Sequence, residues 1–242
     1  MQAIEIKGLT KRYKDVVAVN DLSLSVAQGE LLALLGVNGA GKTTTVKMLS
    51  CLTAPTSGDA LLLGKSIVKD RAEVKSIIAV SPQETAIAPG LSVKENLALM
   101  CGVYGFSKEV SQQKIAQVSE KMGLLSVMTK KAGKLSGGWQ RRLSIAMALI
   151  SDPKILFLDE PTLGLDVIAR SDLWDIIRTL KGTVTVILTT HYMEEAEALS
   201  DRIAIMRDGT LLLCETSQKI KEIAQTDNFE QAFVRIVKGV EK

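Results

Sequence analysis

The sequence predicts an α/β fold, and three features of the chain support this prediction. Short apolar runs at 31–35 and 155–158 are typical of strands in the buried centre of a parallel sheet. The first run stops at a glycine and is followed by a helical pattern, and the second ends in two carboxylates. Between Ser92 and the second run the pattern is helical, which indicates a helical region inserted between sheet-forming segments. Ser-Val-Lys-Glu at 92–95 is a capping box that opens one helix. The apolar face of another consists of Val110, Ile115, Val118 and Met122.

The first thirty residues predict β-strands. Apolar and polar side chains alternate there, as in strands with one buried face, and turn residues follow at 28–30. The apolar positions of this alternation are Ile4, Ile6, Leu22, Leu24 and Val26. We expect further strands at 60–63 and 77–80, and a β-branched strand at 184–190.

The segment 36–43, Gly-Val-Asn-Gly-Ala-Gly-Lys-Thr, matches a phosphate-binding loop and stands between a predicted strand and a predicted helix. Its glycines let backbone N–H groups converge on phosphates, and the helix adds its positive end. Lys42 is expected to reach the β- and γ-phosphates, Thr43 to bind Mg²⁺, and Thr44 to add a phosphate contact. The other nucleotide-contacting residues expected here are Gly36, Asn38, Gly39, Ala40 and Gly41. An ordinary glycine-rich turn is the alternative, and the flanking strand and helix argue against it.

Two carboxylates, Asp159 and Glu160, follow the second apolar run. Sites in parallel sheets lie at the carboxyl ends of the strands. We expect Asp159 to hold Mg²⁺ through water and Glu160 to act as the general base that polarises the attacking water. For the pair taken alone, a surface acidic pair at a strand end is a fair alternative.

His191, the only histidine in the chain, ends the strand predicted at 184–190. A lone histidine is usually a packed or solvated residue. Because neighbouring parallel strands end at one edge, however, we expect His191 to lie near Asp159. There it can contact the γ-phosphate and hold the water or Glu160 in place.

Leu-Ser-Gly-Gly at 135–138 completes a series of motifs that resembles the ATP-binding-cassette (ABC) ATPases. Alone, Ser-Gly-Gly is a common entry to a helix. Here it lies between the phosphate-binding loop and the Asp-Glu strand, and it precedes an amphipathic helix with apolar Leu143, Ala146, Met147 and Ile150. The resemblance covers about residues 4–209. It implies a P-loop NTPase core with a mixed sheet, an N-terminal antiparallel β subdomain and an α-helical insertion.

The resemblance also implies roles for the residues that match the family motifs. Tyr13 resembles the aromatic residue that stacks on adenine, and Gln83 resembles the glutamine that touches Mg²⁺ and the attacking water. Asp166, in Gly-Leu-Asp at 164–166, resembles the segment that crosses to the partner subunit. His191 matches the switch histidine.

The Leu-Ser-Gly-Gly segment is expected to bind a phosphate that another subunit presents, so that two copies close around ATP. The residues that would do so are Ser136, Gly137 and Gly138. Trp139 stands where the family most often has glutamine, which puts the details of the closed interface in doubt. Val37 stands where proline is often found, in a variable position of the loop.

We expect one domain with two lobes and a tail. Residues 1–84 and 151–214 are assigned to the nucleotide-binding core with its β subdomain, 85–150 to the helical subdomain, and 215–242 to a helical tail. In the family, the helical subdomain meets the transmembrane partner. The apolar face of the tail, which packs on the core of this chain or contacts a partner, consists of Phe229, Ala232, Phe233, Ile236 and Val237. The loop at 86–91 carries apolar residues, either as a packing detail or as a socket for a short helix of the membrane subunit.

Composition excludes several other classes of protein. The chain of 242 residues is 46% hydrophobic and 24% charged, as in soluble globular domains, and no apolar run approaches the roughly 18 residues of a membrane span. We see no signal-peptide pattern. A net charge of +3 gives no reason to expect nucleic acid as a partner. The three cysteines fit no zinc pattern and suit a reducing cytosol.

These observations predict an ATP-binding and ATP-hydrolysing subunit, a homodimer or heterodimer, that powers a membrane transporter. It would meet the membrane only through a permease subunit, at the cytoplasmic face. Segments 81–84, 188–197 and 228–233 resemble the subgroup that exports drugs, polysaccharides or haem-like cargo. The alternatives are an importer ATPase and a non-transport cassette protein that acts on ribosomes or DNA. The second is disfavoured because such chains usually carry two cassettes or long coiled-coil insertions.

Overall fold

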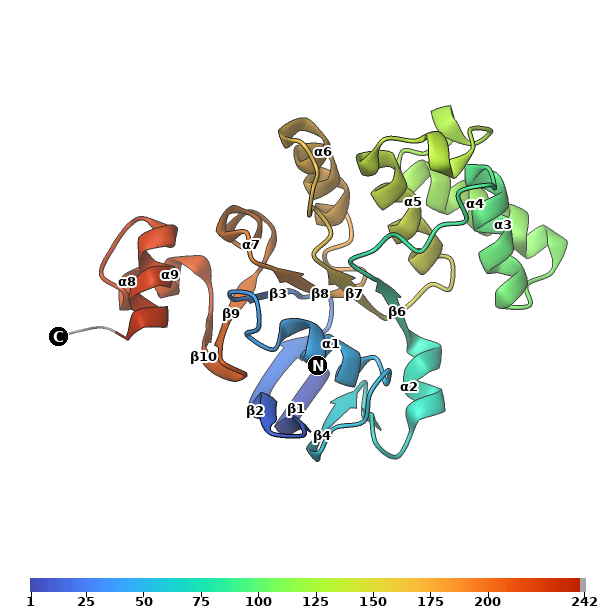
Figure 1. The fold of residues 1–242 in the computed structure, drawn as a ribbon. Helices are drawn as coiled ribbons and strands as arrows, with labels where there is room; N and C mark the ends of the chain where they lie inside the picture. Colours follow the sequence, from blue (N-terminus) through green and yellow to red (C-terminus); the bar gives the residue numbers. More distant parts are fainter. Residues whose placement is uncertain (240–242) are drawn as a thin grey trace.

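The computed structural model describes residues 1–239, which form two β-sheets surrounded by helices (Figure 1). The first sheet is antiparallel and has the strand order β2 (Val16–Ala27), β1 (Gln2–Tyr13), β4 (Ser57–Leu62) and β5 (Lys65–Ser66). The second has the order β10 (Thr210–Glu215), β9 (Arg202–Arg207), β3 (Leu31–Leu35), β8 (Thr185–Thr190), β7 (Ile155–Asp159) and β6 (Ile78–Ser81).

The second sheet is mixed, as predicted. Strands β6, β7, β8, β3 and β9 run parallel, and β10 pairs antiparallel with β9 at the edge. The central strands are buried along their whole length, which is why β3 and the first four residues of β7 read as apolar runs, while β8 combines apolar residues with threonine. Because these strands are parallel, the loops that follow them all leave from the same edge of the sheet.

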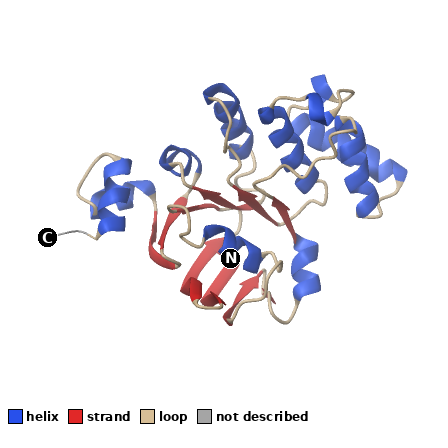
Figure 2. Ribbon diagram, in the orientation of Figure 1, coloured by secondary structure: helices blue, strands red, loops and turns tan. Residues whose placement is uncertain are grey.

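Side chains of the central strands alternate between two cores. On β7, Ile155 and Phe157 face helix α1 (Lys42–Leu49) and the antiparallel sheet, and α1 lies between the two sheets (Figure 2). Leu156 and Leu158 face the opposite side, which packs against the helical region. Successive side chains of a strand point to opposite faces of the sheet, so alternate residues of β7 enter different cores and both faces of the sheet are covered.

The inserted helical region consists of α3 (Val93–Val103), α4 (Lys108–Lys121), two 3₁₀ turns (Leu125–Val127 and Ala132–Lys134) and α5 (Gly137–Leu149). Ser92 and Glu95 form the predicted capping box at the start of α3. Helix α4 buries Ile115 and Val118 in the apolar core that it shares with α3 and α5. The expectation that Val110 shares their buried face is wrong, because this residue lies in the first turn of α4 and is 38% exposed.

Helix α2 (Arg71–Ile77) was not predicted, whereas α8 (Ser217–Ile223) lies in the tail that was expected to be helical. Helix α2 buries only Val74, and α8 buries only Ile220. Seven residues with one apolar anchor show no periodicity that sequence reasoning could detect. Because Ile77 closes α2, the strand expected at 77–80 is β6 at 78–81.

The remaining helices are α6 (Val167–Arg178), α7 (Met193–Leu199) and α9 (Phe229–Lys238). Phe229, Ala232 and Phe233 of α9 are buried in a third apolar cluster with β3, β9 and α7, and Ile236 and Val237 pack against it. The tail face therefore packs on the core of this chain. Residues 240–242 of the predicted tail lie outside the described part.

The loop after β6 carries two large apolar side chains that are partly exposed. Ile87 is half-buried and packs against the helical core, and Leu91 is also half-buried. For Ile87, the structure supports the alternative of a packing detail. No helix within residues 1–239 is long and apolar enough to cross a membrane.

Candidate functional site

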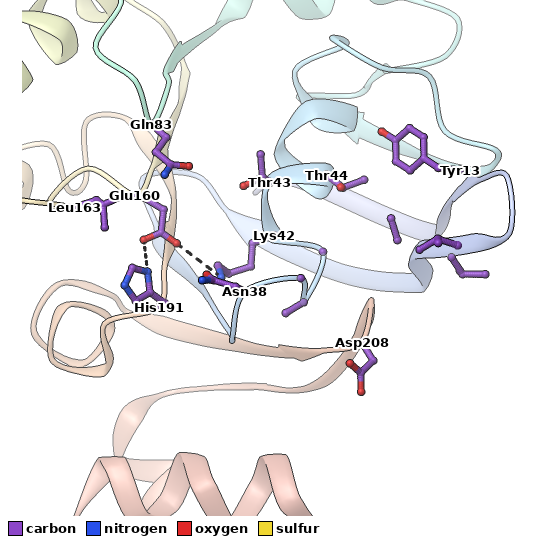
Figure 3. Close-up of a pocket in the computed structure, with 16 residues that line it drawn as sticks. Tyr13, Asn38, Lys42, Thr43, Thr44, Gln83, Glu160, Leu163, His191 and Asp208 are labelled. Atoms are coloured by element: carbon purple, nitrogen blue, oxygen red, sulfur yellow. Dashed lines mark hydrogen bonds and ion pairs between the residues drawn. The ribbon is translucent and has the colours of Figure 1, made fainter.

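The loops at the carboxyl edge of the parallel sheet enclose a cavity of about 700 Å³ (Figure 3). Each parallel strand contributes a loop to this edge. The phosphate-binding loop follows β3, Gln83 follows β6, Glu160 follows β7, His191 follows β8, and Asp208 follows β9. Tyr13 lines the opposite end of the cavity from His191.

Two glycines of the loop after β3, Gly36 and Gly41, have no room for a side chain. A Cβ at Gly36 would collide with the carbonyl oxygen of Met206. At Gly41, where φ is +99°, a Cβ would lie 2.6 Å from the carbonyl oxygen of Ala18. The backbone of the loop therefore packs directly against Met206 and Ala18, which only glycine permits at these two positions.

Lys42, the first residue of α1, is only 5% exposed. Its Nζ donates hydrogen bonds to the carbonyl oxygens of Gly36 (2.6 Å) and Val37 (3.3 Å) and lies 3.8 Å from Oε1 of Glu160. Burial lowers the pKa of Lys42, while the charges of Glu160 and Asp159 oppose that shift. The loop thus encloses a cation that carboxylates partly compensate.

Glu160 stands between this cation and His191. Its Oε2 lies 2.6 Å from Nδ1 of His191, and Figure 3 shows the three side chains converging. The Glu160 backbone has φ of +49°, in the left-handed region, and its N–H donates to the carbonyl and hydroxyl oxygens of Thr189. A carboxylate fixed in this way can accept a proton from a water molecule in the cavity.

Asp159 and Thr43 bring two oxygen atoms together beside the cavity. The Thr43 hydroxyl donates to Oδ1 of Asp159 at 3.3 Å, and the hydroxyl of Thr189 donates to the same atom. Within residues 1–239 there is no cluster of three acidic, histidine or cysteine side chains that could hold a metal. One carboxylate and one hydroxyl nevertheless fit Mg²⁺, which usually takes one or two protein oxygens beside phosphate and water.

Gln83 lines the cavity, and sequence reasoning missed the residue that fixes its backbone. Arg141 of α5 is 5% exposed and donates to the carbonyl oxygens of Pro82 (2.6 Å) and Gln83. Burial lowers the pKa of this guanidinium. In the sequence nothing separates Arg141 from Arg142 beside it on the same helix.

Tyr13 ends β1 and pairs with Val16 across the hairpin. Its ring is 45% exposed at the mouth of the cavity, where a flat base can stack. The structure adds cavity-lining residues that the sequence analysis did not propose, namely Val16, Val17, Ala18, Leu163 and Asp208. The hairpin register could have suggested the first three, whereas nothing in the sequence marks Asp208.

The remaining predicted residues lie elsewhere. Ser136, Gly138 and Asp166 line a second cavity of about 360 Å³, together with Trp139 and Arg142. Gly137 is the first residue of α5, beside them. The structure therefore does not bring the Leu-Ser-Gly-Gly segment to the phosphate loop of the same chain.

Three contacts lie among the residues of this second cavity. Oδ1 of Asp166 accepts a hydrogen bond from the backbone N–H of Ala169 at 2.9 Å and so caps α6. The Arg142 guanidinium lies 4.8 Å from the centre of the Trp139 ring and 2.9 Å from Asp172. Trp139 thus lines the cavity, and its ring makes a cation–π contact with Arg142.

Comparison with known proteins agrees with this geometry. The sequence model of the family described as ABC transporter matches residues 19–163. The chain belongs to the ABC transporter family. The resemblance inferred from the motifs is thereby confirmed, and the chain is an ABC ATPase, the ATP-binding and ATP-hydrolysing subunit of a transporter.

Individual relatives of this ABC ATPase cover most of its length. It is 38% identical over 242 residues to the doxorubicin resistance ATP-binding protein DrrA of Mycobacterium tuberculosis, covering 99% of this chain and 73% of that protein. It is 42% identical over 207 residues to the Nod factor export ATP-binding protein I of Burkholderia orbicola, covering 85% of this chain and 68% of the relative.

A solved structure is also similar to this ABC ATPase. It is described as a dimeric structure of a post-hydrolysis state of the ATP-binding cassette MJ0796 bound to ADP and Pi. The TM-score is 0.78 at 27% sequence identity, and the match covers 88% of this chain and 98% of that chain.

Replacing Lys42 tests the phosphate loop. Lys42→Ala should weaken binding of a non-hydrolysable ATP analogue by about 3 kcal/mol, roughly a hundredfold in Kd, because a buried cation is lost and Glu160 loses its partner. Titration calorimetry measures the change. Lys47→Ala, on the exposed face of the same helix, is the matched control and should bind like the wild type. Unchanged affinity of Lys42→Ala would contradict the assignment of the loop.

Proposed function

We propose that this ABC ATPase drives export through a membrane permease by closing as a dimer around ATP. The observation that carries the proposal is the cluster of Lys42, Glu160 and His191 on the floor of the cavity. It combines a buried cation for phosphate groups with a carboxylate held for proton transfer. A nucleotide triphosphate with an attacking water requires both.

In the proposed mechanism, the phosphates lie on the N–H groups of the loop, and Lys42 binds the β- and γ-phosphates. Thr43, Asp159 and Gln83 would hold Mg²⁺, and when bound the ion neutralises charge on the phosphate oxygens. Glu160 accepts a proton from the water that attacks the γ-phosphate. His191 holds Glu160 in position and donates to the γ-phosphate, and Tyr13 stacks on the adenine.

The dimer follows from the separation of the two cavities. Ser136 and the N–H groups of Gly137 and Gly138 begin helix α5 but lie apart from the phosphate loop of their own chain. A helix start with free N–H groups is suited to an anion. We propose that it binds the γ-phosphate of ATP on a second copy or a related subunit, with Asp166 at the same interface. The dimeric state described for the similar solved structure supports this arrangement.

The direction of transport rests on relatives. One is named for doxorubicin resistance and another for Nod factor export, and both align over most of this chain. We propose that a permease subunit anchors this chain at the cytoplasmic face of the membrane. Co-purification of the tagged chain from membranes identifies that subunit, and transport assays with the assembled complex then determine direction.

Glu160→Gln tests both the general base and the dimer. The amide cannot accept a proton, so ATP hydrolysis should fall by about 10²–10⁴-fold while ATP binding persists. Trapped ATP should hold two copies together, and size-exclusion chromatography with ATP should show a dimer. ADP in place of ATP is the control and should leave the monomer. Hydrolysis at the wild-type rate would contradict the role of Glu160.

Mixing two inactive variants tests whether each site uses two chains. In a dimer of Lys42→Ala with Ser136→Arg, one site carries both lesions and the other carries neither. Random mixing should therefore restore about a quarter of the wild-type activity. Mixing Lys42→Ala with Glu160→Gln is the control, because both lesions lie in the same half-site and no intact site forms. Absence of rescue in proven heterodimers would show that each chain hydrolyses ATP alone.

A further inference from the structure

A buried acid, Glu195, lies behind the catalytic edge of the sheet and has no part in the mechanism above. It is in helix α7, four residues after His191, and its exposed fraction is 0%. A completely buried glutamate is unusual unless it has partners. Its contacts therefore indicate what it does.

One oxygen of Glu195 connects separate segments of the site. Oε1 accepts a hydrogen bond from the Thr162 hydroxyl at 2.8 Å and another from Nε1 of Trp174 at 3.2 Å. Thr162 belongs to the loop that begins with Glu160, and Trp174 belongs to α6, which Asp166 caps. Helix α7 itself follows the strand end that carries His191. Glu195 thus joins three segments that bear proposed site residues.

The other oxygen has no partner. Among residues 1–239, Oε2 of Glu195 is the only buried side-chain nitrogen or oxygen without a hydrogen bond. An unpaired oxygen of a charged carboxylate is very unfavourable in such a place. A neutral acid lessens this cost, since it removes the buried charge. Oε1 then serves as the carbonyl oxygen with two lone pairs for two donors, and the proton lies on Oε2.

The electrostatic surroundings favour the neutral form. Burial is the largest influence and raises the pKa of Glu195. Hydrogen bonding from the side chains of Thr190, Thr162 and Trp174 lowers it, and the nearby charge of Glu160 raises it again. The positive groups on the packed elements form no ion pair with Glu195, although the charge of Arg141 attracts it and opposes the neutral form. Arg141 on α5 bonds the carbonyl oxygens of 82 and 83, and on α6 Arg178 pairs with Asp175 and Arg170 lies over the Tyr192 ring.

Further acids face the same region from α7 and the tail. Glu194 is exposed, and Glu197 pairs with Lys221 of α8 at 3.0 Å. Glu230 of α9 lines a groove beside Glu194 and His191. These groups add negative charge, so none of them favours an ionised Glu195.

We propose that Glu195 is a positioning residue which, as a neutral carboxylic acid, fixes the Glu160 loop and helix α6 to the strand end that carries His191. This proposal rests on the proposed function, because the proposed function is what assigns catalytic roles to Glu160 and His191. Glu195 itself touches neither Glu160 nor His191 by any hydrogen bond. It fixes the backbones of these two residues relative to each other. Through α6 it also links the first cavity to Asp166, which lies in the second cavity.

The protonation state has a direct test that needs no activity. A neutral acid in the folded chain ionises in the unfolded chain above a pKa of about 4.3, so rising pH destabilises the wild type through this group. Glu195→Gln lacks this effect. Between about pH 5 and the pH at which Glu195 ionises in the folded chain, the ratio of the unfolding constants of wild type and variant should rise by up to about tenfold per pH unit.

Denaturant unfolding of both proteins from pH 5 to 8 measures this ratio, and any constant cost of the amide cancels in its slope. Glu194→Gln, an exposed neighbour on the same helix, is the matched control and should show no slope. A flat ratio for Glu195→Gln, or a ratio that moves in favour of the wild type as pH rises, would overturn the neutral acid.

The positioning role is tested by kinetics. Glu195→Ala should lower kcat for ATP at least tenfold and change KM less, because the Lys42 loop does not touch Glu195. Glu195→Gln keeps the carbonyl acceptor and should stay within about threefold of the wild-type kcat. If Glu195→Ala does not fold, Thr162→Val replaces it, because it removes one donor and keeps the side-chain shape.

The outcomes separate the two proposals. A Glu195→Ala or Thr162→Val protein with wild-type kcat, or a Glu195→Gln protein as impaired as Glu195→Ala, would overturn the positioning role. If the Glu160→Gln protein hydrolyses ATP at the wild-type rate, the proposed mechanism fails, while the pH dependence of unfolding still reports on Glu195.

Discussion

The structure depends on a buried lysine. Lys42 brings a positive charge into a part of the molecule that is almost closed to water, and its neighbours compensate that charge with carbonyl oxygens and with Glu160. A buried charge of this kind requires close partners, and removal of one partner is strongly destabilising. The carboxyl edge of the parallel sheet supplies these partners from strands that are far apart in the sequence. We infer that phosphate groups replace the carbonyl oxygens when nucleotide binds, so the cation is prepared for an anion before the anion arrives.

The other polar groups of the site are connected to this centre through backbone and helices. Thr189 holds both Asp159 and Glu160, and Arg141 ties the segment of Gln83 to helix α5. Helix α5 starts at the Leu-Ser-Gly-Gly segment, so the same helix that reaches the first cavity also forms the second. We therefore infer that, when two copies close around ATP, whole helices and strands move together, because the site residues are bonded to them. Glu195 performs the corresponding task for α6 and α7.

The sequence predicted the sheet and the phosphate loop because their constraints are local. Apolar runs mark fully buried strands such as β3, and a glycine pattern marks the loop. Because parallel strands end at one edge, the sequence alone also placed His191 near Asp159. The short helix α2 left no periodic signal, and Val110 was placed on a buried face although it lies in an exposed first turn. Arg141 and Glu195 were missed because charged residues are normally read as surface positions, and only tertiary packing buries them.

The central claim is that the buried cation binds the phosphates of ATP, and a structure of the Glu160→Gln protein with ATP and Mg²⁺ tests it most directly. The account predicts that Nζ of Lys42 leaves the carbonyl oxygen of Gly36 and lies within hydrogen-bond distance of the β- and γ-phosphates. It also predicts Ser136 of a second copy beside the γ-phosphate. Phosphates bound outside the cavity, with Lys42 still on the Gly36 carbonyl, would contradict it.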